Sequence, residues 1–327
     1  MTIARVLWLS RPGCAVLQRE PVREPGPGEA RVRSICSGVA AGLTRLIARG
    51  ELPEAARSAL PPSSVRGTWP GPLAFGSSLV GAIDAVGAGV SGEHLGERVL
   101  LAAPHQDTLL AAVGLLRTPP SEPPAARVTL ASALESAIAA LWDAEIVLGD
   151  RVVVIGLGTL GQLVAWLARR AGALSVTGVD PDAPRAALAV SLGATDAASS
   201  VIAAASEIAA ADVVVEASGS AEVLGALLAQ VGPGARLVVP AFHAAGAALP
   251  LEGAFVARRA GLRSSRAASL DPRRRTRARA MVAELLHEAV LDRLIGPPVP
   301  FSEAPAFFAE LAQGGARCPP HTVIAYQ

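Results

Sequence analysis

The sequence contains no lysine, so all 29 of its basic residues are arginine, and Tyr326, next to the C-terminus, is its only tyrosine. Enzymes that form a Schiff base with a carbonyl substrate need a lysine amine, and reductases of the short-chain type use a tyrosine–lysine pair. Both kinds of catalysis are therefore excluded for this chain.

Cysteine is also scarce. Cys14, Cys36 and Cys318 are too few and too far apart for a disulfide framework or a CxxC metal motif, so we expect buried thiols. The formal net charge of +1 gives no reason to expect nucleic acid as a partner. No apolar stretch approaches the roughly 20 residues that span a bilayer, and no N-terminal segment has the pattern of a secretory signal. The composition predicts a soluble, cytoplasmic enzyme.

The most informative stretch runs from Gly149 to Asp180. Val152 to Ile155 is a continuous apolar run, which is typical of a strand buried on both faces of a parallel sheet. A turn of the form G-x-G-x-x-G follows at once. The next segment places apolar residues at helical spacing: Leu160, Leu163, Val164, Leu167, Ala168 and Ala171. Strand, glycine turn and helix in this order predict a Rossmann nucleotide-binding unit.

Each glycine of the motif has a physical role. Gly156 permits the tight turn, Gly158 lets the backbone approach a pyrophosphate, and Gly161 allows the helix to pack closely on the strand. The phosphates then lie at the N-terminus of the helix. The next apolar run ends in Asp180, which is placed to accept hydrogen bonds from ribose hydroxyls and so predicts NAD rather than NADP. The other predicted cofactor-binding residues are Thr159, Leu160, Arg185, Ser218 and Pro240.

Strand and turn patterns divide the chain into two domains. The first hundred or so residues contain short strands separated by glycine and proline turns, interrupted by a Pro- and Ser-rich stretch, 50–72, that predicts an irregular surface loop. From about residue 130, helices and strands alternate, which predicts an α/β domain with a parallel sheet. An Arg-rich helix (273–290), another helix (303–313) and a final strand (321–326) are expected to end the chain.

The order of these parts resembles the medium-chain dehydrogenase/reductase superfamily over essentially the whole chain. The resemblance rests on PGPGEARVRSICSGV, FGSSLVGAIDAVGAGV with GERVLL, LGDRVVVIGLGTLG with GVD, and VVVEASGS. The PHQD and ARRAGLRSS segments resemble a branch that includes bacteriochlorophyllide a dehydrogenase-like proteins. The resemblance implies an α/β protein with a GroES-like β domain, residues 1–130 and 270–327, and a Rossmann domain with a doubly wound parallel sheet that binds NAD, residues 131–269.

The sequence departs from zinc-dependent members of that superfamily where they hold the metal. Those members carry a cysteine directly after S-G-V and a G-H-E at the start of the following strand; here the matching residues are Ala40 and Gly76-Ser77-Ser78. The four-cysteine lobe of structural zinc is missing too, since no cysteine lies between Cys36 and Cys318. A catalytic zinc needs three protein ligands, so we expect no metal.

Without zinc, a side chain must handle the proton when hydride moves. The resemblance places three residues near the reacting atoms. His105 follows a strand that leads toward the cleft. Glu135 lies on the helix that flanks the nicotinamide, and burial would raise the pKa of its carboxyl group. His243 follows a strand whose carboxyl end should border the nicotinamide ring. The predicted substrate contacts are Ser77 and Gln106.

The leading hypothesis is a zinc-independent, NAD(H)-dependent oxidoreductase that interconverts an alcohol and a carbonyl on a small or medium organic molecule. An enoyl reductase acting on an activated C=C bond is an alternative, weakened because the tyrosine that such enzymes often use has no counterpart here. A lyase, a cyclase or a binding protein that retains the nucleotide site is a further alternative. It is motivated by the nonpolar character of Ala40 to Leu43, where relatives carry polar residues.

The resemblance also implies a homodimer, in which the Rossmann sheets of two subunits join through their final strands. Gly261 to Ser265 is the expected edge strand, whose unpaired backbone groups can pair with a second copy. Arg263 in mid-strand is the kind of charge that blocks such pairing, which is the argument for a monomer. The apolar run Ala244 to Leu251 favours the dimer, because it would otherwise be exposed.

Overall fold

The structure, a computed structural model, describes residues 2–244, 249, 251, 253–314 and 318–326. The chain forms two compact units, Met1–Ser132 with Ala283–Gln327, and Ala133–Val282. The first boundary lies close to the predicted one at residue 130, whereas the second falls after Val282 and not near residue 270. The α/β fold class, with one β-rich unit and one parallel-sheet unit, is confirmed.

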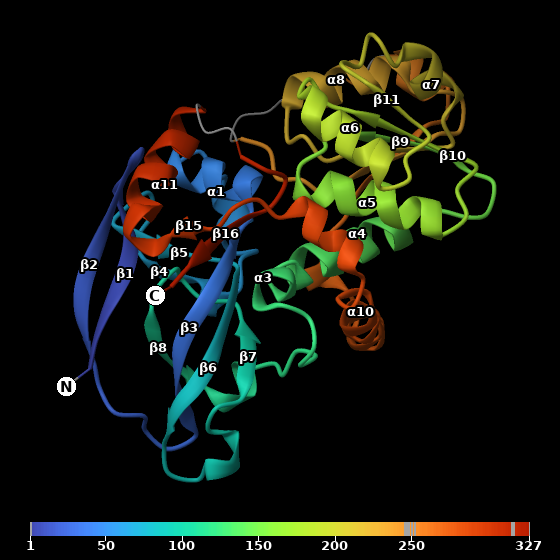
Figure 1. The fold of residues 1–327 in the computed structure, drawn as a ribbon. Helices are drawn as coiled ribbons and strands as arrows, with labels where there is room; N and C mark the ends of the chain where they lie inside the picture. The colour runs from blue at the N-terminus through green and yellow to red at the C-terminus, as the bar shows by residue number, and fades with distance from the viewer. Residues whose placement is uncertain (1, 245–248, 250, 252, 315–317, 327) are drawn as a thin grey trace. The chain divides into compact units, whose positions relative to one another are not determined.

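The first unit contains two sheets (Figure 1). Its strands are β1 (Thr2–Arg11), β2 (Cys14–Val22), β3 (Glu29–Val39), β4 (Val65–Gly67), β5 (Leu73–Phe75), β6 (Ser78–Val86), β7 (Arg98–Leu101), β8 (Thr108–Ala112), β15 (Val299–Pro300) and β16 (Thr322–Ala325). Its helices are α1 (Ala41–Ala48), α2 (Glu54–Arg57), α3 (Ala125–Val128) and α11 (Ala304–Gln313). One sheet has the order β2–β1–β5–β4, and the other β15–β16–β3–β6–β7 with β8 paired to β3.

Strand β3 organises the first unit. Its first half alternates buried and more exposed residues, as expected for a strand with one face on the core; Ala30 and Val32 pack there against Leu79 and Ile83. Its last residues are buried on both faces, between β6 and β16. Because successive side chains of a strand point to opposite faces, Ser37 and its neighbour at position 38 face different sides of this buried end.

The stretch 50–72 is more ordered than the predicted irregular loop. It contains α2, a 3₁₀ turn (Pro62–Ser64) and β4, which pairs with β5. Leu52 and Leu60 are buried, so apolar side chains among the prolines and serines anchor this stretch to the unit. The expectation of a purely irregular loop was wrong, because it weighed the turn residues and overlooked these two anchors.

The second unit has a six-stranded, fully parallel sheet in the order β11–β10–β9–β12–β13–β14. The strands are β9 (Arg151–Ile155), β10 (Ser175–Val179), β11 (Asp196–Ala198), β12 (Val213–Glu216), β13 (Arg236–Val239) and β14 (Gly261–Ser264). The helices are α4 (Ala131–Asp143), α5 (Thr159–Arg170), α6 (Ala183–Ser191), α7 (Ala205–Ala210), α8 (Ala221–Gln230), α9 (Gly253–Ala257) and α10 (Pro272–Leu285).

Both faces of this sheet are covered, which explains the continuous apolar run of β9. Val153 and Ile155 belong to a core cluster that includes residues of α7 and α8. Val154 lies on the opposite face, next to Gly161 of α5. Most of helix α10, up to Val282, groups with this unit, and two of its residues one turn apart, Ala278 and Val282, are buried. The second boundary therefore lies past residue 270.

Two further expectations concern composition. Cys36 and Cys318 are buried, Cys14 is half-buried, and none of the three forms a disulfide. Burial raises the pKa of the Cys36 thiol to about 12, so it stays protonated and unreactive at neutral pH.

Within the described ranges, no helix is both long enough and apolar enough to cross a bilayer.

Candidate active site

The strand order of the parallel sheet reverses between β9 and β12, and the glycine turn after β9 lies at this point. Gly156 has a φ of 86°, and a Cβ there would lie 2.6 Å from the backbone nitrogen and Cα of Ser218. A Cβ on Gly161 would lie 1.8 Å from the carbonyl oxygen of Gly156. These distances are too short for any side chain. The turn, the start of α5 and the segment after β12 therefore fit together only with glycine at both positions.

The middle glycine, Gly158, is open instead. No described atom outside its own neighbours lies within 4 Å of its Cβ position, and it precedes the first residue of α5, a helix whose N-terminus has no side-chain cap. Open space beside an uncapped helix N-terminus suits a diphosphate. The residues present therefore fit a nicotinamide dinucleotide, whose pyrophosphate Gly158, Thr159 and Leu160 would hold.

Asp180 is buried and ties the glycine turn to the end of β10. Its Oδ2 accepts the backbone N–H of Leu157 at 2.7 Å, and its Oδ1 accepts that of Asp182 at 2.9 Å. Each carboxylate oxygen retains further acceptor capacity, so contact with the ribose is compatible with these bonds. Arg185 is half-buried on α6, with its Nε 3.9 Å from an oxygen of Asp182. The sequence indicated Asp180 as a ribose-binding acid, but it did not indicate that this carboxylate also accepts a hydrogen bond from the glycine turn.

We expect Asp180→Ala to weaken NADH binding by about 1–3 kcal/mol, the scale for losing a hydrogen bond to a charged group. Binding of NADPH should suffer less, because a repulsive carboxylate is removed together with the ribose acceptor. Fluorescence titration with both nucleotides measures this. The matched control is Asp182→Ala, which removes the N-cap of α6 and should leave the ratio of the two affinities unchanged. A wild type that already prefers NADPH would refute this reading of Asp180.

A buried carboxylate that the sequence analysis did not select lies beside the glycine turn. Glu216, at the end of β12, is fully buried. Its Oε1 accepts the backbone N–H groups of Ser218 (2.8 Å) and Gly219 (3.2 Å) and the hydroxyl of Ser218. Its Oε2 lies 3.0 Å from Nε2 of His243. The signal in the sequence was a charged residue directly after three valines, at the carboxyl end of a buried strand.

The loops after β12 and β13 pack on each other at this edge. A Cβ on Gly219 would lie 2.9 Å from the carbonyl oxygen of Phe242, and Pro240 follows β13 half-buried. Ser218, His243 and the glycine turn therefore lie in one unit, at the carboxyl edge of its parallel sheet. Ser218 is a predicted cofactor-binding residue, and His243 is a predicted catalytic residue.

His105 lies within the first unit and is 1% exposed. Its Nδ1 is 2.7 Å from Ser37 Oγ, which is in turn 2.8 Å from the hydroxyl of Tyr326, and its ring packs edge-on against Phe308. Burial lowers the pKa of His105 to about 4 and raises that of Tyr326. His105 is therefore a neutral imidazole inside this unit, and reaching a substrate would require a relay or a movement.

A second buried histidine, absent from the predictions, lies across β3. A Cβ on Gly38 would lie 2.9 Å from the ring of His321. Thr129 donates its hydroxyl hydrogen to the carbonyl of Ala126 (2.6 Å), so its 2.8 Å contact with His321 Nε2 requires the hydrogen on Nε2. Nδ1 is then an acceptor, without a partner among the described residues. Burial lowers the pKa of His321 to about 4.

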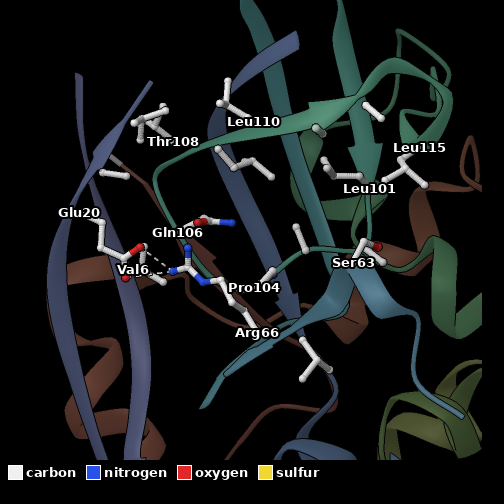
Figure 2. Close-up of a pocket in the computed structure, with 18 of the residues that line it drawn as sticks. Val6, Glu20, Ser63, Arg66, Leu101, Pro104, Gln106, Thr108, Leu110 and Leu115 are labelled. Atoms are coloured by element: carbon white, nitrogen blue, oxygen red, sulfur yellow. Dashed lines mark hydrogen bonds and ion pairs between the residues drawn. The ribbon is translucent and has the colours of Figure 1, made fainter. Parts of the chain in front are cut away.

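The remaining predicted residues are dispersed. Glu135 is half-buried on α4 in the second unit, and Ser77 is half-buried just before β6 in the first. Gln106 is 8% exposed and lines a pocket of about 740 Å³ in the first unit. Figure 2 shows this pocket, with the ion pair of Glu20 and Arg66 on one side of Gln106. Its walls are mostly apolar, and none of the predicted cofactor residues belongs to it.

Comparison with known proteins shows similarity to dehydrogenases. Residues 159–285 match the family model described as zinc-binding dehydrogenase. A D-guloside 3-dehydrogenase of Shigella flexneri is 32% identical over 193 residues. A protein of Sinorhizobium meliloti 1021 bound to NADP, assigned as a zinc-binding dehydrogenase, has a similar fold, with a TM-score of 0.79 and 20% identity over 99% of this chain and 100% of that one. Residues 159–285 are thus similar to a zinc-binding dehydrogenase domain, and the whole chain has the fold of solved dehydrogenases.

The sequence similarity to curated relatives covers part of the chain, whereas the similarity in fold to solved structures covers nearly all of it. The match to the D-guloside 3-dehydrogenase covers 56% of this chain and 55% of that protein, so the chain spans about half the length of the curated relatives it matches. A short chain alcohol dehydrogenase of Escherichia coli CFT073, in complex with NADH, has a TM-score of 0.78 at 16% identity over 99% of this chain and 100% of that one. At such identities the structures show the fold alone, here a β-rich unit together with a parallel-sheet unit.

The matching family model is described as zinc-binding, but the described residues at the expected metal positions do not fit zinc. Ala40, at the end of β3, has no ligating atom, and Gly76, Ser77 and Ser78 supply at most hydroxyls. In the described part of the chain, no three side chains of His, Cys, Asp or Glu converge on one point. A tetrahedral zinc site requires three such ligands.

Proposed function

We propose that this chain is a zinc-independent, NAD(H)-dependent oxidoreductase that interconverts an alcohol and a carbonyl. The observation that carries the proposal is the glycine turn, in which Gly156 and Gly161 are held against Ser218 and against each other while the space beside Gly158 is open. When bound, the nicotinamide supplies the acceptor or donor of hydride. Preference for NAD rests on Asp180, whose carboxylate would face a 2′-phosphate with like charge.

Chemistry at the substrate oxygen is assigned to this chain's own side chains. Without a Lewis acid, a proton must move between the substrate oxygen and a positioned acid or base. His105, Glu135 and His243 are the candidates, with Ser77 and Gln106 as proposed substrate contacts. The enoyl reductase alternative is not favoured, because Tyr326 is already hydrogen-bonded to Ser37 inside the first unit.

The first substrates to test are secondary alcohols of sugars, since the curated relatives are named D-guloside 3-dehydrogenases. Purified protein, NAD⁺ and a panel of glycosides and simple alcohols are followed by the absorbance of reduced nicotinamide. We expect turnover that survives chelator treatment, with well under one zinc per chain by elemental analysis. One zinc per chain, with activity lost on chelation and restored by added zinc, would contradict the proposal that catalysis is independent of zinc. Conversion of substrate without net change in nicotinamide would favour a non-redox function.

A homodimer joined at β14 is part of the proposal. All four residues of β14 are exposed at the sheet edge. Arg263, which could block pairing, instead reaches Asp143 and Glu145 of its own unit, each at 3.3 Å. The apolar run 244–251 lies largely outside the described residues. Light scattering should give twice the chain mass of 33.1 kDa; a monomer across micromolar concentrations would contradict the dimer.

A further inference from the structure

We propose that Glu216 is a positioning residue that holds His243 in one tautomer, with Nδ1 as the proton acceptor for the alcohol. This inference rests on the proposed function and narrows its three catalytic candidates to His243. The two residues come from neighbouring strands, Glu216 from the end of β12 and His243 from the segment after β13. Their Oε2 and Nε2 atoms lie 3.0 Å apart.

The surroundings of Glu216 fix the direction of this contact. Three donors from Ser218 and Gly219 converge on Oε1, which orients the carboxylate and leaves Oε2 toward the histidine. Oε2 and His243 Nε2 are both buried and have no other partner among the described residues. Between a carboxylate and a neutral imidazole, an unprotonated Nε2 would place two acceptors 3.0 Å apart, which is repulsive, so the hydrogen of the imidazole is on Nε2. Nδ1 of that neutral imidazole then carries the free lone pair.

The alignment of the two groups is short of ideal hydrogen-bond geometry. Catalytic hydrogen bonds are often poorly aligned without ligand and tighten when substrate binds. The 3.0 Å distance already permits the bond, and rotation of the imidazole would align it. A carboxylate that orients an imidazole is a recurrent arrangement in catalysis and in metal binding.

The position of the pair suits the reaction. Ser218, one of the donors to Glu216, lies against Gly156, where the strand order reverses and where a ligand binds in a doubly wound sheet. His243 keeps 14% of its side chain exposed, whereas the side chain of Glu216 is fully buried. In alcohol oxidation a bound nicotinamide would accept the hydride of the carbinol C–H bond. Nδ1 of His243 would accept the proton of the O–H bond as the C=O bond forms.

Glu216→Gln tests the assignment with little change in shape. The amide oxygen can still accept the N–H groups of Ser218 and Gly219, so the loop is kept. Its NH₂ group then faces Nε2 of His243, which must become an acceptor, and the hydrogen moves to Nδ1. The matched control is Glu222→Gln, the same change at an exposed carboxylate in the first turn of α8.

The primary measurement is the tautomer of His243 by ¹⁵N NMR of histidine-labelled protein, which has five histidines to assign. We expect Nε2–H in the wild type and in Glu222→Gln, and Nδ1–H in Glu216→Gln. An unchanged tautomer in Glu216→Gln, or Nδ1–H in the wild type, would overturn the proposal. This readout needs no substrate, so it stands even if the proposed alcohol oxidation fails.

Kinetics give the second measurement. With an alcohol that the wild type oxidises, Glu216→Gln should lower kcat by roughly 10³–10⁴-fold, the scale of a wrong tautomer in a catalytic triad, with a much smaller change in KM and unchanged NADH affinity. His243→Ala should lose kcat similarly, and added imidazole should restore part of it. In the double variant His243→Ala/Glu216→Gln, added imidazole should restore less of kcat than in His243→Ala alone. An inverted tautomer with kcat unchanged would remove His243 from the proton transfer.

Discussion

Lowering the pH from 7 to 5 is expected to cost the folded protein about 4 kcal/mol of unfolding free energy, through two buried histidines. The pKa values of His105 and His321 are each about 4 in the folded chain, against 6.5 for the ordinary side chain. The unfolded chain therefore binds more protons than the folded chain between these values, so stability falls as the pH falls. Each histidine contributes about 2 kcal/mol at pH 5, which is large beside a total of about 5–15 kcal/mol.

Urea unfolding at a series of pH values measures this effect. The slope of unfolding free energy against pH near pH 5 should correspond to about two protons in the wild type and about one in His321→Gln. The control is His287→Gln, since that side chain is 44% exposed, and it should leave the slope unchanged. Carboxylates affect stability at lower pH than these histidines. The hydrogen bond from Arg23 lowers the pKa of Glu29 to about 2, so the contribution of Glu29 to the unfolding free energy is lost only below pH 4.5. A flat stability between pH 7 and 5 would show that the two imidazoles are not buried neutral.

Gly161→Ala should abolish nucleotide binding and destabilise the second unit, because the new methyl group would lie 1.8 Å from the carbonyl oxygen of Gly156. Helix α5 would have to move away from the turn that it completes. We expect a loss of NADH affinity of more than about 100-fold and a stability loss of about 1–3 kcal/mol, the usual scale for overpacking. Isothermal titration and thermal unfolding measure the two effects separately.

Two glycine variants serve as comparisons. Gly158→Ala should fold with nearly wild-type stability, since its Cβ meets no described atom within 4 Å, and should still lose nucleotide affinity by filling the space beside the pyrophosphate. Gly42 lies in α1, and a Cβ there also meets no described atom within 4 Å. Gly42→Ala should therefore stabilise the protein by about 0.5–1 kcal/mol and leave NADH binding unchanged. Normal NADH binding by Gly161→Ala would mean that the cofactor does not use this turn.

Much of the site could be predicted because the relevant physics is local in sequence. The glycines of the turn, the strand before them and the helix after them lie within twenty residues, and each is constrained by its neighbours. Asp180 is predicted from its place at the end of the next strand. His243 is predicted because strand ends in a parallel sheet gather at one edge. The roles of both residues stay predictions. Secondary structure in the second unit could be read from the same periodicities.

The missed residues have a different origin. Glu216 follows three valines, which marks the end of a buried strand, but its partners depend on the strand order, which places β12 between β9 and β13. His321 precedes the last strand, and its tautomer depends on Thr129, which is 192 residues away in the chain. Tyr326 lies next to the C-terminus in sequence, yet it is hydrogen-bonded to Ser37, 289 residues away in the chain. None of these pairings leaves a local pattern.

The sequence by itself determined the nucleotide turn, the fold class, the absence of lysine chemistry and the loss of the zinc ligands, since each is a matter of which residues are present and how closely they are spaced. Only the tertiary structure decided that His105 and His321 are buried and neutral, that the carboxylate of Asp180 also supports the glycine turn, and that Glu216 faces His243. Burial, tautomer and charge partner depend on the groups that folding brings within about 3 Å, and those groups come from distant parts of the chain.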